Sequence, residues 1–312
     1  MSGSPLITFI VPTYNIEGWM LRECIGSILA QPLADDEREV IVVDDGSDEP
    51  VAPMDGVTLV RETNSGQACA RNLALDMARG EWVAFVDADD RLLEGWGRVV
   101  NLLHDSLLDV IRIGVAGERK GVRCLSAADY LLGENMPGAA WRYVFRRRLL
   151  DGSSPALRFT PGIVHEGTKS PNCDAVSSLR FTPGIVHEDE EFMPLMLARA
   201  GEMAVVGGAC YYYRVRGGST MTTASREHIE RRLRDFEGVV RRLHALQIPV
   251  LRRRVAQLVM DYVYNSMRLE RSYAATRTRV RRLRDCGLWP LPPIRATWKY
   301  DLFRLVTRIL LP

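Results

Sequence analysis

The sequence contains the stretch Trp82-Val-Ala-Phe-Val-Asp-Ala-Asp-Asp90, in which five apolar residues lead directly into three carboxylates. An unbroken apolar run of this length indicates a strand that is buried on both faces, as in a parallel sheet. Three carboxylates at its end would repel one another and lose their hydration unless a cation neutralises them. Oxygen ligands without neighbouring His or Cys suit Mg²⁺ or Mn²⁺. For this stretch alone, an Asp-rich turn that caps the next helix is an equally good interpretation.

The segments around this stretch alternate between strands and helices. Buried strands are predicted at residues 6–11, 39–43, 57–61 and 82–86, and amphipathic helices at residues 17–31 and 66–79. Such an alternation predicts an open parallel sheet, whose ligands bind at the carboxyl ends of the strands. Beyond residue 95 the pattern is weaker, with a helix expected at 96–107, strands at 110–115, 203–206 and 209–213, and helices from residue 226 onward.

Polar residues also follow the first two predicted strands. Asp44-Asp45-Gly46-Ser47 follows the second strand, where a carboxylate can bind a base or a ribose, although Asp-Gly is also a frequent turn pair. Pro12-Thr13-Tyr14-Asn15 follows the first strand, where Tyr14 can stack on a base and its polar neighbours can cap a helix. Because parallel strands end at the same edge of a sheet, we expect the three groups to converge there.

Together these segments resemble the motifs of family-2 glycosyltransferases, in the same order and at similar spacing between residues 6 and 220. The matching segments are Ile10-Val-Pro-Thr-Tyr-Asn15, Ile41-Val-Val-Asp-Asp-Gly-Ser47, Asn64-Ser-Gly-Gln-Ala-Cys-Ala-Arg-Asn72, Gly80-Glu-Trp-Val-Ala-Phe-Val-Asp-Ala-Asp-Asp90 and His187-Glu-Asp-Glu-Glu-Phe192. A dinucleotide-binding domain is disfavoured, because no GxGxxG turn follows the first strand.

The resemblance implies the GT-A fold, a Rossmann-like α/β architecture with an open mixed sheet flanked by helices. It places the glycosyltransferase domain at residues 1–222. A nucleotide-sugar-binding half is expected at 1–110 and an acceptor-side half at 111–222. Residues 223–312 are expected to form an α-helical, Arg-rich C-terminal extension.

The implied activity is inverting transfer of a hexosyl or N-acetylhexosaminyl group from a nucleoside-diphosphate sugar, with UDP as the expected nucleotide and Mn²⁺ or Mg²⁺ as the cofactor. The expected acceptor is a hydroxyl of a glycan or of a lipid-linked saccharide, in capsule, exopolysaccharide or lipopolysaccharide assembly. A non-catalytic relative that binds nucleotide-sugar or acts as a scaffold is the main alternative. A nucleotidyltransferase is a further alternative, but it would be expected to carry a basic Gly-rich loop after its first strand.

The resemblance also implies a role for each residue at the strand ends. The residues expected to contact the nucleotide-sugar are Pro12, Thr13, Tyr14, Asp45, Arg71, Asp87, Arg214 and Ser219. Among them, Asp45 would meet the base, Asp87 the ribose, and Arg71 the base or the diphosphate. Asp89 would be the principal metal ligand, and Asp90 would support it or cap the next helix.

Inversion in a single step needs a base that takes the proton of the acceptor hydroxyl. By resemblance this base is Asp189, with Glu188 as the nearest substitute; an acidic helix start is the alternative interpretation. The ten residues 157–166 recur identically at 179–188, which indicates a 22-residue tandem duplication within residues 157–188. The first copy is followed by Gly167, where the base should be, so we interpret one repeat unit as an insertion.

The formal net charge of +2 conceals a basic C-terminal region: residues 226–312 carry 20 Arg and Lys against 8 Asp and Glu. This charge can form the solvated face of ordinary helices, or it can contact anionic lipid through residues 298–311, which mix aromatic, basic and apolar side chains. Nucleic acid is not expected as a partner, because no recognised module accompanies the charge. The sequence contains no apolar run of the ~20 residues needed to span a bilayer. We therefore expect a cytoplasmic protein, peripheral on the inner face of the membrane if the tail binds lipid.

Overall fold

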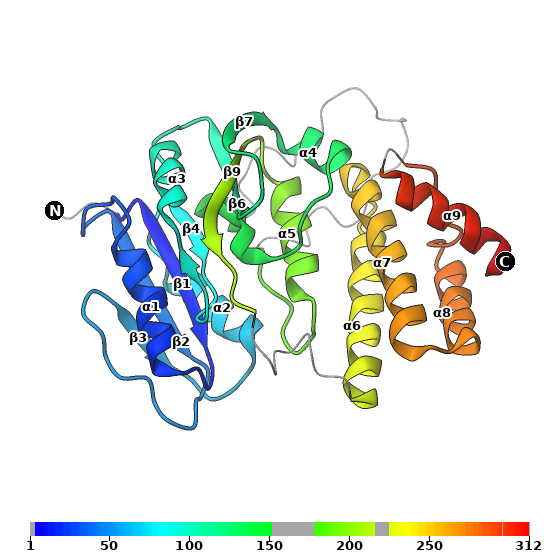
Figure 1. The fold of residues 1–312 in the computed structure, drawn as a ribbon, viewed down its shortest axis with the longest axis horizontal. Coiled ribbons are helices and arrows are strands. Elements are labelled where there is room, and N and C mark those ends of the chain that lie inside the picture. The colour runs from blue at the N-terminus through cyan, green and yellow to red at the C-terminus, as the bar shows by residue number, and fades with distance from the viewer. Residues whose placement is uncertain (1–3, 152–177, 216–224, 295, 312) are drawn as a thin grey trace.

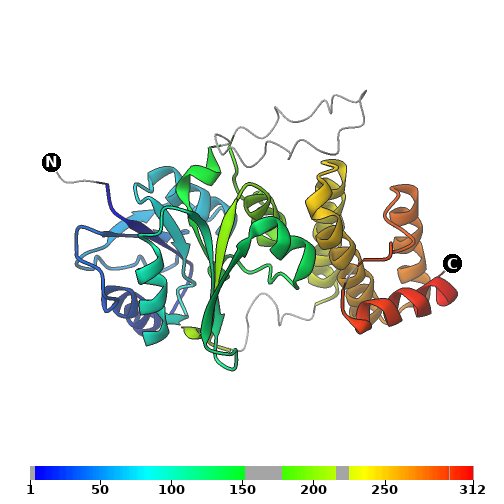
Figure 2. The same cartoon turned by 90° about the horizontal axis from the view of Figure 1, so that it is seen from above.

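The structure, a computed structural model, describes residues 4–151, 178–215, 225–294 and 296–311. A single β-sheet and its flanking helices occupy one end of the molecule, and four C-terminal helices occupy the other (Figures 1 and 2). These helices are α6 (Arg226–Ala245), α7 (Arg252–Glu270), α8 (Tyr273–Asp285) and α9 (Trp298–Leu310). No helix in the described part of the chain is both long enough and apolar enough to cross a membrane.

The first four strands are parallel and form one half of the sheet. They are β1 (Ile7–Thr13), β2 (Arg38–Asp44), β3 (Thr58–Arg61) and β4 (Trp82–Phe85). Strand β1 lies between β2 and β4, and β3 extends the sheet beyond β2. All seven residues of β1 are buried, as the apolar run predicts. The alternating strands and helices predicted for the first ninety residues are confirmed.

The other half of the sheet is mixed. Strand β8 (Tyr143–Arg146) pairs antiparallel with both β4 and β6 (Leu108–Val115), and β9 (Glu202–Tyr212) is parallel to β6. The short strands β5 (Arg91–Leu92) and β7 (Gly121–Ser126) both run antiparallel to β9. The open mixed sheet implied by the resemblance is therefore confirmed.

Strand β9 is a single strand, where the sequence pattern predicted two. The expected break coincides with Gly207 and Gly208, and Gly208 has a positive φ of 87°. The pairing with β6 shifts register between Ile113 and Val115, opposite this part of β9. The glycines therefore make an irregularity inside one strand, which the sequence pattern could not distinguish from a turn.

Helices cover both faces of the sheet. On one face lie α1 (Gly18–Leu29) and α3 (Gly97–Leu102). On the other lie α2 (Gln67–Met77), α4 (Ala127–Gly133) and α5 (Glu188–Ala198). Alternate β1 side chains serve the two faces: Phe9 packs with the first set and Ile10 with the second.

The C-terminal helices share an apolar core with the second face of the sheet. Leu233 of α6 and Tyr262 of α7 belong to the same buried cluster as Phe192 of α5 and Phe145 of β8. The region is helical, as predicted. Helix α6 packs against α5.

Candidate functional site

The ends of β1, β2 and β4 lie side by side, as the sequence analysis predicts. Thr13 is in register with Asp44, and the backbone N–H of Asp45 donates to the Thr13 carbonyl at 2.9 Å. The N–H of Val86, at the end of β4, donates to the carbonyl of Ile10 at 3.0 Å. The three polar segments therefore meet at one edge of the sheet.

The turn after β1 exposes the ring of Tyr14. Asn15 has a positive φ of 46°, and its backbone N–H donates to the hydroxyl of Ser47 at 2.9 Å. The Asn15 side chain also exchanges hydrogen bonds of 2.8 and 2.9 Å with Asp48. These bonds join the turns after β1 and β2, and Tyr14 stays 49% exposed between them. An exposed ring on a fixed turn can stack on a planar base.

The other predicted nucleoside residues lie deeper in the site. Pro12 and Thr13 are buried at the end of β1, and the Thr13 hydroxyl has no hydrogen-bond partner among the described residues. The two carboxylate oxygens of Asp45 accept the N–H groups of Ser65 and Gly66, at 2.7 and 2.9 Å. Asp45 therefore holds the loop before α2, and its contact with a base remains a prediction.

Asp90 organises the acidic turn after β4. Its carboxylate is buried and accepts the hydroxyl of Tyr211 at 2.8 Å and the backbone N–H of Arg214 at 2.7 Å. The Tyr211 hydroxyl in turn accepts the N–H of Asp87 at 3.1 Å. Burial raises the pKa of Asp90 to about 7, despite the hydrogen bond from Arg214. Through these hydrogen bonds, Asp90 fixes the acidic turn against the end of β9.

Asp87 and Asp89 are the partly exposed carboxylates of this turn. Burial raises the pKa of Asp87, and the Arg71 guanidinium beside it opposes that rise. Within the described residues, no group of three or more His, Cys, Asp or Glu side chains is arranged to hold a metal ion. Mg²⁺ and similar ions often bind one or two carboxylates and complete their shell with substrate phosphates and water. Asp87 and Asp89 are two such carboxylates, and binding of a metal ion together with the nucleotide remains a prediction.

Arg71 of α2 connects the acidic turn to the start of α5. Its side chain is 4% exposed, and its guanidinium lies 2.9 Å from Glu188 Oε1 and 3.4 Å from Asp87 Oδ1. It also lies over the rings of Phe85 and Phe181, at 5.6 and 5.2 Å from their centroids. Arg71 is therefore a buried bridge between the two halves of the site, next to Asp87.

The first turn of α5 carries four consecutive acidic residues, 188–191, where the helix dipole favours negative charge. Three of them pair with arginines of other elements. The pairs are Glu188 with Arg71, Glu190 with Arg254 and Glu191 with Arg242. The fourth, Asp189, accepts the N–H of Glu190 at 3.0 Å and makes no ion pair with any described residue. Asp189 therefore differs from its three acidic neighbours, because it has no arginine partner among the described residues.

The surroundings of Asp189 disfavour its charged form. Burial raises its pKa, and the negative charges of Glu188 and Glu190 raise it further. A carboxyl whose pKa is raised toward neutrality is a stronger proton acceptor once ionised. Glu188, the predicted substitute, is tied to Arg71 and is the weaker candidate for a base.

The second copy of the repeat is part of the core. Phe181 is 1% exposed and stacks on Phe192 at 4.0 Å between ring centroids. Asn72 of α2 exchanges hydrogen bonds of 2.8 and 2.9 Å with the backbone of Phe181. The packing of this copy therefore fixes the position of Glu188, its last residue, and of Asp189, which follows it. The first copy, 157–166, lies outside the described residues.

Comparison with known proteins identifies the domain. Residues 8–119 match the model of a family described as glycosyl transferase family 2. This segment therefore matches the domain of glycosyltransferase family 2. The matched segment contains the ends of β1, β2 and β4, and therefore every residue of the acidic turn.

Two curated relatives of this glycosyltransferase are from Bacillus subtilis. EpsJ, named an uncharacterized glycosyltransferase, is 30% identical over 175 residues, 47% of this chain and 49% of that protein. GgaB, named a minor teichoic acid biosynthesis protein, is 26% identical over 235 residues, 69% of this chain and 24% of that protein. The chain thus spans half or less of the length of these relatives.

Among solved structures, residues 1–349 of Staphylococcus aureus TarS, in complex with UDP-GlcNAc, have the same fold. The TM-score is 0.63 at 18% sequence identity, over 98% of this chain and 88% of that one. This likeness confirms that the glycosyltransferase has the GT-A fold.

The remaining residues of the glycosyltransferase site lie near the end of β9. Arg214 was expected to contact the nucleotide-sugar, but its guanidinium lies 2.5 Å from Glu23 of α1 and donates to the carbonyl of Asp89 at 2.8 Å. Its contact with the donor thus remains a prediction, and Ser219 lies outside the described residues. Trp141 stacks on Tyr211 at 4.2 Å between ring centroids and on Tyr213 at 5.9 Å. The sequence signals for this stack were the run of three tyrosines at 211–213 and Trp141, which begins a segment that resembles the acceptor side of the family.

Proposed function

We propose that this protein transfers a sugar from a nucleoside-diphosphate sugar, with UDP as the nucleotide, to a hydroxyl of a glycan or lipid-linked saccharide with inversion. The observation that carries the proposal is the arrangement around Arg71. One nitrogen of this guanidinium pairs with Asp87, which follows β4, and another pairs with Glu188 of α5, the helix that also carries Asp189. This arrangement supports a site in which the donor carboxylates and the base lie close to one another.

The comparisons support a role in bacterial surface polysaccharide assembly. GgaB is named for teichoic acid biosynthesis, and the TarS structure contains UDP-GlcNAc. Capsule, exopolysaccharide and lipopolysaccharide assembly use the same chemistry, which joins an activated sugar to an acceptor hydroxyl. A family-2 domain with an acidic turn and a separate base supports this class of reaction.

In the proposed mechanism, the nucleoside stacks on Tyr14 and its ribose binds Asp87. Asp89, with Asp87, would hold Mn²⁺ or Mg²⁺, whose positive charge would stabilise the departing diphosphate. Asp189 takes the proton of the acceptor hydroxyl on the opposite side of the sugar. Tyr213, which is 52% exposed beside Trp141, offers an aromatic surface for the acceptor.

Turnover of a panel of UDP-sugars, with Mn²⁺ and with EDTA, tests this function. We expect transfer or slow donor hydrolysis in Mn²⁺ and at least a tenfold lower rate in EDTA. Asp89→Asn should weaken metal-dependent UDP binding by roughly tenfold, the usual size of a lost charged ligand. Asp55→Asn, at an exposed carboxylate outside the site, is the matched control and should leave UDP binding unchanged.

Two results would contradict the proposal. Donor binding without turnover of any nucleotide-sugar would favour the scaffold alternative. Turnover that is the same in Mn²⁺ and in EDTA would remove the metal from the mechanism and leave glycosyl transfer in place.

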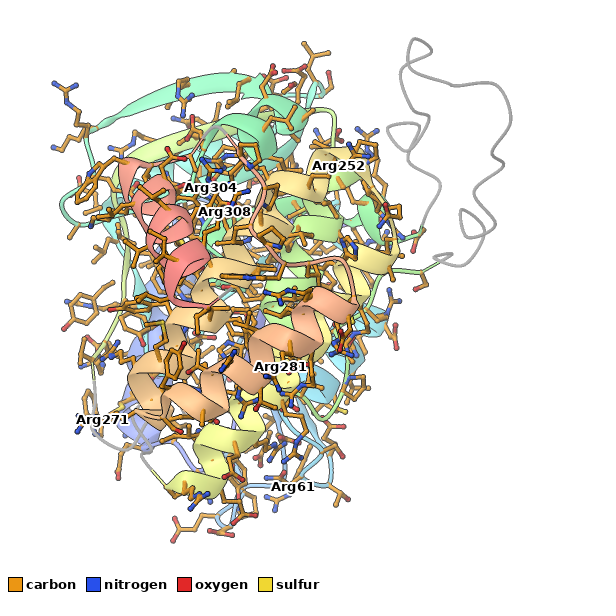
Figure 3. All side chains as sticks on the ribbon, turned by 90° about the vertical axis from the view of Figure 1, so that its right-hand side faces the viewer. Arg61, Arg252, Arg271, Arg281, Arg304 and Arg308 are labelled. Atoms are coloured by element: carbon orange, nitrogen blue, oxygen red, sulfur yellow. The ribbon has the colours of Figure 1, made fainter. Side chains whose placement is uncertain are left out.

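We also propose that α9 attaches the protein to anionic membrane. Its exposed apolar side chains follow a helical spacing along one face, with Trp298 70%, Leu305 60% and Ile309 73% exposed. Exposed Lys299 and Arg308 flank this face on its two sides. Figure 3 looks at this end of the molecule and shows arginines of α7, α8 and α9 spread over it. An apolar stripe bordered by cations fits the interface of an anionic bilayer.

Vesicle co-sedimentation tests the attachment. We expect binding to phosphatidylglycerol vesicles, weakened by salt, and little binding to phosphatidylcholine vesicles. The double variant Leu305→Glu/Ile309→Glu should lose most of this binding. Leu107→Glu, at an exposed leucine outside α9, should retain it. Equal binding by the two variants, or no binding by the wild type, would refute the role of α9.

A further inference from the structure

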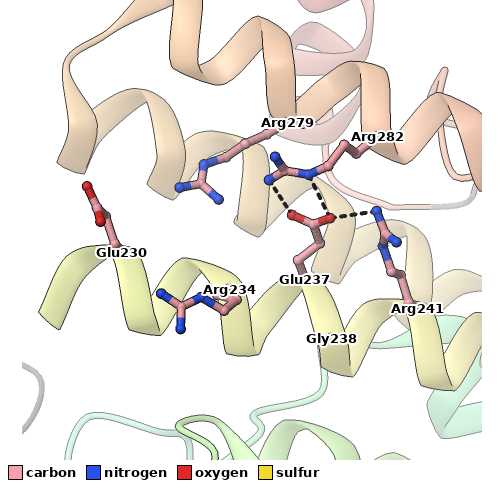
Figure 4. A pocket seen from close by; sticks show the side chains of 7 residues that line it. All are labelled: Glu230, Arg234, Glu237, Gly238, Arg241, Arg279 and Arg282. Carbon is pink, nitrogen blue, oxygen red and sulfur yellow. Dashed lines mark hydrogen bonds and ion pairs between the residues drawn. The ribbon is translucent and has the colours of Figure 1, made fainter. Parts of the chain in front are cut away.

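A second group of guanidinium side chains lies between α6 and α8, outside the donor and acceptor site. It surrounds a pocket of about 490 Å³. The charged side chains that line this pocket are Glu230, Arg234, Glu237, Arg241, Arg279 and Arg282 (Figure 4). None of these residues has a role in the mechanism proposed above.

One buried carboxylate positions two of the arginines. Glu237 is 7% exposed, and its carboxylate accepts hydrogen bonds of 3.1 and 2.8 Å from Arg282 and one of 2.6 Å from Arg241. Tyr262 donates a further hydrogen bond to it, at 2.6 Å. Together these bonds hold the pKa of Glu237 below its ordinary value, although burial acts in the opposite direction. Two positive charges therefore share one fixed negative charge.

The remaining lining arginines differ in how they are held. Arg279 pairs with Glu270 of α7 at 2.5 Å, and its side chain is 13% exposed. Arg234 is exposed, and no carboxylate among the described residues pairs with it. Its neighbour Glu230 is paired with Arg226 at 3.0 Å instead. Figure 4 shows Arg234 on the side of α6 that faces the pocket, with Arg279 on the helix opposite.

The local charge balance favours an anion. The pocket and its paired neighbours comprise five guanidinium groups, of Arg226, Arg234, Arg241, Arg279 and Arg282, and three carboxylates, of Glu230, Glu237 and Glu270. Two positive charges are therefore in excess. If these charged groups served only to hold α6, α7 and α8 together, Glu237, Glu270 and their arginine partners would be sufficient. Arg234 would contribute nothing to such a network.

We propose that this pocket binds a phosphate group, held by Arg234 together with Arg279 and Arg282. Guanidinium groups match phosphate oxygens in charge and in hydrogen-bond geometry. Arginines that are already fixed by carboxylates lose less conformational entropy when they bind. The phosphate can belong to an acceptor chain or to a lipid headgroup, because both present the same chemical group.

The same turn of α6 connects the pocket to the acceptor side. Gly238 lines the pocket, and a Cβ atom at this position would lie 3.1 Å from Arg242 Nη1. Arg242 reaches past it to Glu191 of α5, with hydrogen bonds of 2.6 and 2.8 Å. A phosphate held here would therefore lie on the helix that supports the turn with Asp189.

Calorimetric titration without added metal ion tests the site. The probes are inorganic phosphate, glycerol 3-phosphate and monomeric dihexanoyl-phosphatidylglycerol, below its micelle concentration. We expect at least one probe to bind, and Arg234→Glu to weaken that binding by at least about tenfold. Arg281→Glu makes the same charge change at an exposed position of α8 that does not line the pocket, so it should bind like the wild type.

The outcomes separate the two sources of phosphate. Stronger binding of the short-chain lipid than of glycerol 3-phosphate would assign the pocket to a headgroup, and equal or weaker binding would assign it to an acceptor chain. The proposal is overturned if no probe binds the wild type, or if Arg234→Glu and Arg281→Glu bind alike. Metal-dependent UDP binding, measured on the same three proteins, should be unchanged, which distinguishes this site from the donor site.

Discussion

Asp189→Asn is expected to lower kcat by about 10²–10⁴-fold, the range by which a positioned base accelerates proton transfer. The asparagine keeps the shape of the side chain but cannot accept the proton of the acceptor hydroxyl. UDP binding should change little, because Asp189 lies on α5 and the acidic turn follows β4. Initial rates of transfer and calorimetric titration with UDP measure the two effects separately. Near-wild-type turnover would exclude Asp189 as the base.

The same substitution should stabilise the fold at neutral pH. The folded-state pKa of Asp189 is raised, so folding favours its protonated form. The contribution of Asp189 to the free energy of unfolding is therefore fully present below the unfolded-state pKa. It is lost as the pH rises through the folded-state pKa. The neutral asparagine avoids that loss, so its advantage in Tm over the wild type should grow with pH. Wild-type turnover should rise with pH over the same interval, as the base ionises.

Glu190→Gln is the matched control within the same helical turn. Glu190 is paired with Arg254, whose side chain is 7% exposed, so removing this carboxylate leaves a buried cation without its partner. We expect a lower Tm, the opposite of the change at Asp189. If both variants shifted Tm in the same direction, the distinction between paired and unpaired carboxylates would be wrong.

Arg71→Met should destabilise the protein by about 3–5 kcal/mol, the usual cost of removing one member of a buried ion pair. The substitution leaves Glu188 and Asp87 without the cation that lies between them. Arg180→Met is the control, because Arg180 pairs with Asp76 on the surface and such pairs contribute about 0–1 kcal/mol. Denaturant unfolding of both variants measures the difference.

Rescue by a second substitution distinguishes charge from packing. Adding Glu188→Gln to Arg71→Met removes one of the two carboxylates that have lost their cation. The double variant should therefore recover part of the lost stability. Equal losses in Arg71→Met and Arg180→Met would show that the bridge at Arg71 contributes no more than a surface pair.

The donor half of the site could be predicted because its signals are local. Each buried strand is an apolar run, and the functional residues directly follow the strand, as Asp87 follows Phe85 and Val86. Parallel strands then bring these residues to one edge without any further information. The structure confirms this part of the prediction with shifts of one or two residues at the ends of the strands.

The acceptor half could not be predicted to the same extent, because its determinants are distant in sequence. Arg242 is 51 residues from Glu191, and Arg254 is 64 residues from Glu190. Strand β8 has only four residues, and β7 is exposed over most of its length. Neither strand therefore shows a clear alternation of apolar and polar residues in the sequence. An isolated arginine on an amphipathic helix gives no indication of which carboxylate it will meet.

The arginines that hold α5 also bear on how this enzyme family diverges. The segment that defines the family ends at residue 119, whereas α5 and the arginines of α6 and α7 that fasten its first turn all lie beyond it. Paralogues can therefore inherit the donor half intact and still acquire new acceptors through drift in the C-terminal helices. A substitution at Arg242 or Arg254 would remove an ion pair of the helix that carries Asp189 without changing any residue at the ends of β1, β2 and β4.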